Sequence, residues 1–351
     1  INWNVIMMLV GTMGIVHLFI QSGMPALLAD IILSKSPSVC MAIIALAAFA
    51  GMISAFVDNV ATVLMIAPVG LAVCKKQQIN PVPVIIAIAV SSNLQGAATL
   101  VGDTTSILLG SYTDMSFWDF IWWKGKPSIF FTVELGALGT LFVLLWLFRG
   151  LKQKVAVSTK TEVSDYIPTL LLLFVIAGLI IASFFRLPYV DDYKNGLICL
   201  IICVFGLLQK SIREKSISSI RHFVCNLEYE TLGMLLGLFI VIAGLTNTGI
   251  IDAIAQKFAG MGSHNLLMLY TVLVFSSVLL SAFIDNIPYV ASMLPVVESI
   301  ASNLVIEPTL LYFGLLLGAT LGGNLTPFGA SANVAGIGIL IRIVKELYHT
   351  A

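Results

Sequence analysis

The residues of this chain best suited to chemistry are two aspartates that occur in the same short apolar sequence. Residues 54–59 read Ser-Ala-Phe-Val-Asp-Asn, and residues 281–286 read Ser-Ala-Phe-Ile-Asp-Asn, 227 positions later. A charged carboxylate at membrane depth is costly unless it faces water, an ion or a polar partner. We therefore expect Asp58-Asn59 and Asp285-Asn286 to bind a cation such as Na⁺. Each aspartate could also cap the helix that follows it, and capping is compatible with ion binding.

A second pair of polar segments keeps the same spacing. Residues 96–106 and 323–333 combine glycine, hydroxyl and amide residues inside otherwise apolar runs, and the second copy contains Pro327. Small residues also serve helix packing, but Pro327, Asp103 and Asn324 favour unwound helices whose freed backbone groups bind ions. The predicted ligands here are Thr99, Gly102, Asp103, Thr104, Ser106, Asn324, Thr326, Gly329, Ser331 and Asn333.

The composition places these motifs in a membrane. Of 351 residues, 59% are hydrophobic and 10% are charged, and the mean hydropathy is +1.02. Soluble domains carry about 25% charged residues. The net charge is zero and no basic tract suggests nucleic acid as a partner. Five cysteines imply no disulfide framework, and Cys199 and Cys203 read as packing residues of an apolar helix. Hard oxygen ligands favour Na⁺ or H⁺ as the coupling ion, with no other cofactor.

The apolar runs define the elements that must position these residues. Two segments, 38–74 and 265–303, are each interrupted at Asp-Asn and read as re-entrant helical hairpins. The domains are a first repeat over 1–149, a linker over 150–166 and a second repeat over 167–351. Seven crossings are predicted, at 3–20, 82–113, 128–149, 167–185, 194–209, 228–246 and 309–345, and of these 82–113 and 309–345 are the broken helices.

The basic residues predict the orientation. Thirteen of the 18 lysines and arginines, among them Lys35, Lys75 and Lys152, fall on one side of this topology. That side is expected to be cytoplasmic. Five crossings separate the two hairpin tips, so the hairpins enter from opposite faces and the repeats are inverted, which permits alternating access. The duplication also predicts further helices, one or two before Ile1 and one after Ala351.

These motifs resemble the arsenite-permease/sodium–proton antiporter (ArsB/NhaD-like) branch of the ion transporter superfamily. Residues 281–295 are most similar to the melanosomal P-protein type of permease, and 323–329 followed by Asn333 match the family's second broken helix. Citrate and dicarboxylate transporters of the superfamily carry Ser-Asn-Thr at the tip, where this chain has Asp58-Asn59-Val60 and Asp285-Asn286-Ile287. The resemblance implies an all-α polytopic membrane protein with a divalent-anion/sodium-symporter-like elevator fold, in the plasma membrane as a homodimer.

Together these features favour a transporter rather than an enzyme. The leading hypothesis is a cation-coupled secondary transporter of a small inorganic ion or oxyanion, and the closest alternative is a sodium–proton antiporter. An intramembrane aspartyl protease is a remote alternative, since Asp103 follows Gly102 but Leu100 replaces the first glycine of the protease motif. Among weaker candidates, Glu134 could relay protons or bond a neighbouring helix, while His17 reads as a packing residue and Glu298 as solvated.

Overall fold

The computed structural model describes residues 2–155, 161–185, 190–262 and 265–349, and these residues are almost entirely helical. The first half contains α1 (Trp3–Gln21), α2 (Met24–Lys35), α3 (Val39–Ser54), α4 (Asn59–Gln77), α5 (Pro81–Gly96), α6 (Thr104–Tyr112) and α7 (Ile129–Phe148). The second half contains α8 (Ile167–Ala182), α9 (Lys194–Glu214), α10 (Ser218–Cys225), α11 (Tyr229–Asn247), α12 (Ile250–Gly262), α13 (Leu266–Ser281), α14 (Asn286–Leu304), α15 (Thr309–Gly323) and α16 (Ser331–His349).

Every predicted crossing is helical, and both predicted broken helices are interrupted, at 97–103 and at 324–330. Five described helices, α1, α4, α7, α9 and α11, are long and apolar enough to cross a membrane. Sequence analysis missed α2, α10 and α12, which lie in segments read as connections. It also missed two 3-10 turns, Trp118–Phe120 and Asp191–Tyr193, and an antiparallel pair in which β1 (Trp122–Trp123) faces β2 (Lys126–Pro127).

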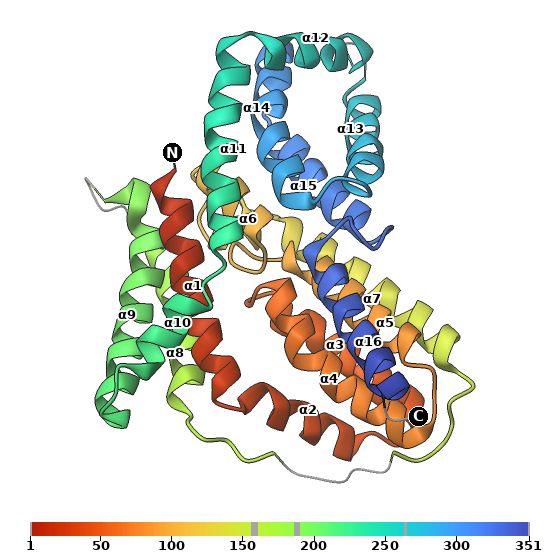
Figure 1. The fold of residues 1–351 in the computed structure, drawn as a ribbon. Helices are drawn as coiled ribbons and strands as arrows, with labels where there is room; N and C mark the ends of the chain where they lie inside the picture. The colour runs from red at the N-terminus through yellow and green to blue at the C-terminus, as the bar shows by residue number, and fades with distance from the viewer. Residues whose placement is uncertain (1, 156–160, 186–189, 263–264, 350–351) are drawn as a thin grey trace.

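The two halves share one order of elements. A long helix (α1 or α11) turns into a shorter one (α2 or α12) at Gly23 or Gly249, both with positive φ, which glycine adopts without strain. Each hairpin follows, and its second arm ends at a left-handed residue, Gln78 or Val305. In Figure 1, α3 and α4 extend inward from the end of the molecule where α2 lies, whereas α13 and α14 extend inward from the end where α12 lies.

Close packing of small residues joins α1 to α9. A Cβ added at Gly11 would lie 2.5 Å from the Cys199 carbonyl carbon, and one added at Gly14 would lie 2.2 Å from the Cys203 sulfur. Both cysteines are buried. They are therefore packing residues, as predicted, and the α1–α9 contact depends on glycine at both facing positions.

An ion pair fixes the β1–β2 loop to the segment that precedes α15. The Lys124 ammonium donates to Glu307 at 2.6 Å, and the indole of Trp123 donates to the same carboxyl oxygen at 3.3 Å. The hydrogen bond from Lys124 is the main cause that lowers the pKa of the Glu307 carboxyl. Both side chains are more than half exposed, so the pair contributes little stability but positions the loop.

Candidate functional site

Each Asp-Asn pair forms the tip of a helical hairpin. Asp58 Oδ2 accepts from the backbone N–H groups of Val60 and Ala61, at 3.0 and 3.2 Å, and thereby caps α4. Asp285 Oδ1 accepts from the N–H of Ile287 at 3.1 Å and caps α14. The capping role is confirmed for both aspartates. Because a cap uses only some of the lone pairs of a carboxylate, each group retains oxygen positions for another partner.

The breaks in the two long helices are closed in the same way. Thr99 donates to the Ala55 carbonyl at the first tip, and Thr326 donates to the Ala282 carbonyl at the second tip. Across each break, Ser106 donates to the Gly96 carbonyl at 3.2 Å, and Asn333 donates to the Gly323 carbonyl at 2.7 Å. The hydroxyl and amide residues predicted as ligands therefore also stabilise the unwound backbone. Each break is tied to the hairpin tip of its own half.

Gly102 and Gly329 allow each break to approach its hairpin closely. A Cβ at Gly102 would lie 2.6 Å from the Gly96 carbonyl oxygen and 2.8 Å from the Ala55 carbonyl oxygen. At Gly329 the Gly323 and Ser281 carbonyl oxygens would both be 2.9 Å away. Real Cβ atoms essentially never come this close to backbone oxygen. Only glycine fits, and several carbonyl oxygens converge at each position.

A chain of asparagine side chains joins the two halves. Asn59 donates to Asn93 Oδ1 at 2.9 Å, and Asn93 donates in turn to Asn324 Oδ1 at 3.0 Å and to the Thr320 carbonyl at 3.2 Å. Asn59 and Asn93 are buried. The first hairpin tip is thus bonded through α5 to the second broken helix.

Asp103 makes the reciprocal connection. Its Oδ2 accepts from Thr105 at 2.7 Å and, more weakly, from Asn286 of the second tip at 3.4 Å. Asp103 is buried, and its carboxyl interacts electrostatically with those of Asp58 and Asp285. On the other side, Asp285 Oδ2 accepts from Ser331 at the start of α16 at 2.8 Å. All three aspartates predicted from the sequence therefore belong to one connected polar centre.

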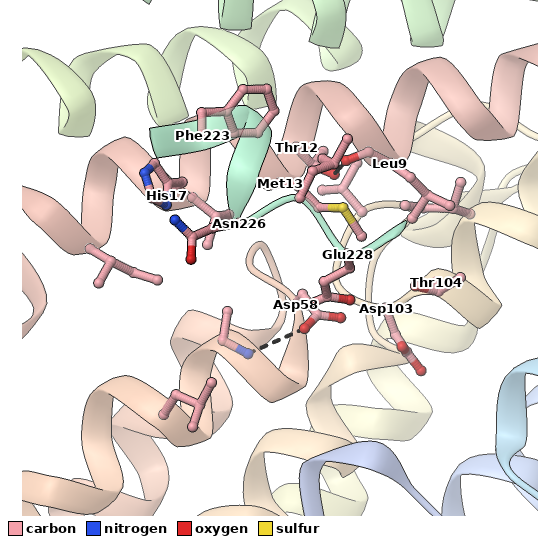
Figure 2. Close-up of a pocket in the computed structure, with 17 residues that line it drawn as sticks. Leu9, Thr12, Met13, His17, Asp58, Asp103, Thr104, Phe223, Asn226 and Glu228 are labelled. Carbon is pink, nitrogen blue, oxygen red and sulfur yellow. Dashed lines mark hydrogen bonds between the residues drawn. The ribbon is translucent and has the colours of Figure 1, made fainter. Parts of the chain in front are cut away.

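A pocket of about 160 Å³ reaches this centre between α1 and the α10–α11 connection. Figure 2 shows the carboxyl groups of Asp58, Asp103 and Glu228 gathered in it, with His17 and Asn226 farther along. Thr104 also lines the pocket, whereas no lysine or arginine does. An acid-lined cavity of this kind attracts cations.

Sequence reasoning missed Asn93, Thr105 and Glu228. Asn93 belongs to the polar run Ser91-Ser92-Asn93-Leu94-Gln95 directly before the first break, and that run was a usable signal. His17 lines the pocket and is hydrogen-bonded, with its Nε2 2.9 Å from the Gln21 amide nitrogen and 3.1 Å from Nδ1 of His222, which agrees with a satisfied packing histidine. Glu298 is exposed, as expected, and accepts a hydrogen bond from Tyr112.

Comparison with known proteins identifies the family. The citrate transporter family pattern matches residues 1–318, which is most of the chain and ends within α15. The chain belongs to the citrate transporter family. A 46 kDa membrane protein of Mycobacterium leprae (strain TN) is 34% identical to it, with 99% of this chain and 79% of that protein aligned. This citrate transporter family member is therefore an integral membrane protein.

Other relatives agree with the resemblance seen in the motifs. An uncharacterized transporter of Mycobacterium tuberculosis (strain ATCC 25618 / H37Rv) is 33% identical over 97% of this chain and 79% of its own length. The P protein of Sus scrofa is 27% identical over 85% of this chain, which spans 44% of that protein. The predicted likeness to P-protein-type permeases is confirmed. The family and the Mycobacterium tuberculosis relative are described as transporters, which agrees with the prediction that this family member is a transporter rather than an enzyme.

The asparagine bridge gives a first testable prediction. Replacing Asn93 with alanine leaves the buried amide of Asn59 and the half-buried amide of Asn324 without their shared partner. An unsatisfied buried polar group costs about 1–3 kcal/mol. We expect Asn93→Ala to lower the apparent melting temperature in detergent and to slow transport. The matched control is Asn80→Ala, which removes an exposed cap at the start of the same helix. Equal behaviour of the two variants would show that the bridge is unimportant.

Proposed function

We propose that this protein is a cation-coupled secondary transporter that moves a small inorganic ion or oxyanion by alternating access. The observation that supports it most is the polar centre, in which each capping aspartate stands beside an asparagine that is bonded across the two halves, Asn59 through Asn93 to Asn324 and Asn286 to Asp103. The cation would be held near Asp58-Asn59 and Asp285-Asn286. Converging carbonyl, carboxylate and amide oxygens are the ligands that Na⁺ and other hard cations prefer.

The arrangement of the hairpins favours alternating access. The two hairpins extend inward from opposite ends of the molecule, and their tips meet the two broken helices at the centre. Inverted repeats around a midplane site are the usual architecture for rocking or elevator-like exchange between two faces. The lysine-rich face, with Lys35, Lys75 and Lys152, would be cytoplasmic, in keeping with the positive-inside rule.

A homodimer would cover apolar surface on the second half. Along α11 the only buried residue is Leu235, while Ile240 and Val241 are 66% and 56% exposed. Lipid and a second copy of the chain are both suitable partners for such a helix. The resemblance to elevator transporters favours a dimer through this part of the molecule, with the plasma membrane as its location.

Sodium–proton antiport is the second candidate, and the composition of the pocket favours it. Three carboxylates line the pocket without a lysine or arginine, so an anion would meet repulsion there unless cations were already bound. In an antiporter, the same aspartates would exchange Na⁺ for H⁺ and no anion would move.

The two candidates differ in their need for an anion. We expect purified protein in liposomes, loaded with a pH-sensitive dye, to acidify or alkalinise the lumen after a Na⁺ pulse. Under the leading proposal Na⁺ instead drives uptake of an added substrate anion, so arsenite, citrate and sulfate are supplied one at a time and their uptake is measured beside the pH signal. A full pH response without any of them would establish antiport instead. Protein-free liposomes correct for passive leak, and the absence of both a pH response and Na⁺-dependent anion uptake would contradict both candidates.

A further inference from the structure

A second cavity lies away from the aspartate pocket, between α3, α5 and α7. It measures about 340 Å³, and most of its lining is apolar, including Ala47, Met52, Phe130 and Leu138. Its polar lining consists of Ser91, Gln95, Glu134 and Thr140. The flanking surface of α7 is strongly apolar, with Leu135 70% exposed, and is suited to lipid. The cavity thus places one carboxyl group in an apolar setting.

The partners of Glu134 are neutral. Its carboxyl accepts a side-chain hydrogen bond from Gln95, which is buried. The hydroxyl of Ser91, also buried in the lining, has no hydrogen-bond partner among the described residues. The Thr140 hydroxyl already donates its hydrogen bond to the Gly136 carbonyl. An unused buried hydroxyl in the same cavity lining as a carboxyl marks a position where a further hydrogen-bonded species fits.

No charged group faces Glu134 from the elements packed against it. Among the residues that the structure describes, no lysine, arginine or histidine lines the cavity. Within α3 and α5 the only titratable side chain is the Cys40 thiol, at the far end of α3. On α7 itself, Arg149 follows the opposite end of the helix and lies over the ring of Trp146. Without a cation, a carboxyl in such a setting is most stable when a proton neutralises it.

Gln95 connects this carboxyl to the transport machinery. It is the residue before Gly96, where α5 reaches its break. Its side chain also crosses α3 closely, since a Cβ added at Gly51 would lie 3.0 Å from Gln95 Cγ. A change of charge on Glu134 would therefore alter the interactions of Gln95, and through Gln95 those of the first hairpin arm (α3) and of the first break.

We propose that Glu134, with Gln95 and Ser91, forms a proton-binding site inside the membrane, separate from the cation site at the hairpin tips. The proton resides on the Glu134 carboxyl, and the neutral side-chain amide of Gln95 is its hydrogen-bonding neighbour. This site would supply a titrating group to the transport cycle proposed above. Its existence does not depend on which ion is transported.

An apolar carbodiimide tests the site directly. Dicyclohexylcarbodiimide partitions into lipid and reacts with protonated carboxyls: the acid proton moves to a nitrogen, the carboxyl oxygen bonds to the central carbon, and acyl transfer to nitrogen gives a stable acylurea. We expect the full chain in liposomes at neutral pH to carry this adduct on Glu134, as mapped by peptide mass spectrometry. A water-soluble carbodiimide added outside should instead favour the exposed Glu298.

The controls separate this proposal from the transport proposal. Glu134→Gln should lose the adduct, while Glu134→Asp should retain it and so shows that loss is not caused by misfolding. In flux assays Glu134→Gln should lose the pH dependence of transport that the wild type shows, with retained saturation by Na⁺. An unlabelled Glu134 in folded protein, or equal labelling by the water-soluble reagent, would overturn the proton site. Labelling without any transport would instead count only against the proposed function.

Discussion

Replacing Asp285 with asparagine is expected to abolish cation-coupled flux while leaving the protein folded. The substitution keeps one oxygen that can cap α14 through the N–H of Ile287, and the new amide NH2 can donate to the Ser331 hydroxyl where Oδ2 now accepts from it, so local structure should survive. It removes the negative charge that would hold a cation at the second tip. Hydrogen bonds and contacts to charged groups contribute about 1.5–3 kcal/mol each, so cation activation should weaken by about 10- to 100-fold or more.

The experiment compares Na⁺-dependent uptake into proteoliposomes for wild type, Asp285→Asn and Asp252→Asn. Asp252 is an exposed acid on α12 that accepts from Ser299, which makes it a matched control for loss of one charge. Melting curves in detergent monitor folding of each variant. Undiminished coupled transport by Asp285→Asn would refute the cation-binding role of this aspartate.

Replacing Gly102 with alanine should produce the largest structural defect of any single-methyl addition at the site. The new Cβ would meet the carbonyl oxygens of Gly96, Ala55 and Ser54 within 2.8 Å, and all three belong to backbone that cannot rotate away. Overpacking of this kind typically costs about 1–3 kcal/mol or more. The first break and the first hairpin tip must separate to accept the methyl group. We therefore expect both lower thermal stability and loss of transport.

Gly139→Ala is the matched control for this substitution. A Cβ at Gly139, in α7, has no heavy atom within 4 Å, and alanine is preferred over glycine in a helix by about 0.5–1 kcal/mol. This variant should melt at or above the wild-type temperature and transport normally. If Gly102→Ala also melted and transported like the wild type, the close approach of the first break to the first hairpin would be needed neither for stability nor for transport.

Much of this architecture could be predicted because the same motifs occur twice in the sequence, 227 positions apart. The shared spacing of Asp58 with Asp285 and of Gly102 with Gly329 predicts both hairpin tips and both breaks. The short helices α2, α10 and α12 were missed because they lack the length of a crossing. Their existence depends on contacts with the rest of the protein, which periodicity within one segment does not report.

The site shows a similar division. Residues that occur in both copies, such as Thr99 and Thr326, were found by comparing the copies. Asn93 was missed because its counterpart is Thr320, so the duplication does not mark it, although its amide connects the halves. Glu228 was missed because it adjoins the pocket only through folding, from a segment distant in sequence from Asp58.

The amide links between opposite halves have a thermodynamic consequence. Since Asn59 reaches Asn324 through Asn93, and Asn286 reaches Asp103, neither tip can change its bonding without altering the surroundings of the other. If an ion binds at each tip as we propose, occupancy at one tip would shift affinity at the other, and linkage requires that the influence be equal in both directions. Under that proposal the two positions would share a single free-energy balance, and their filling would be cooperative rather than independent.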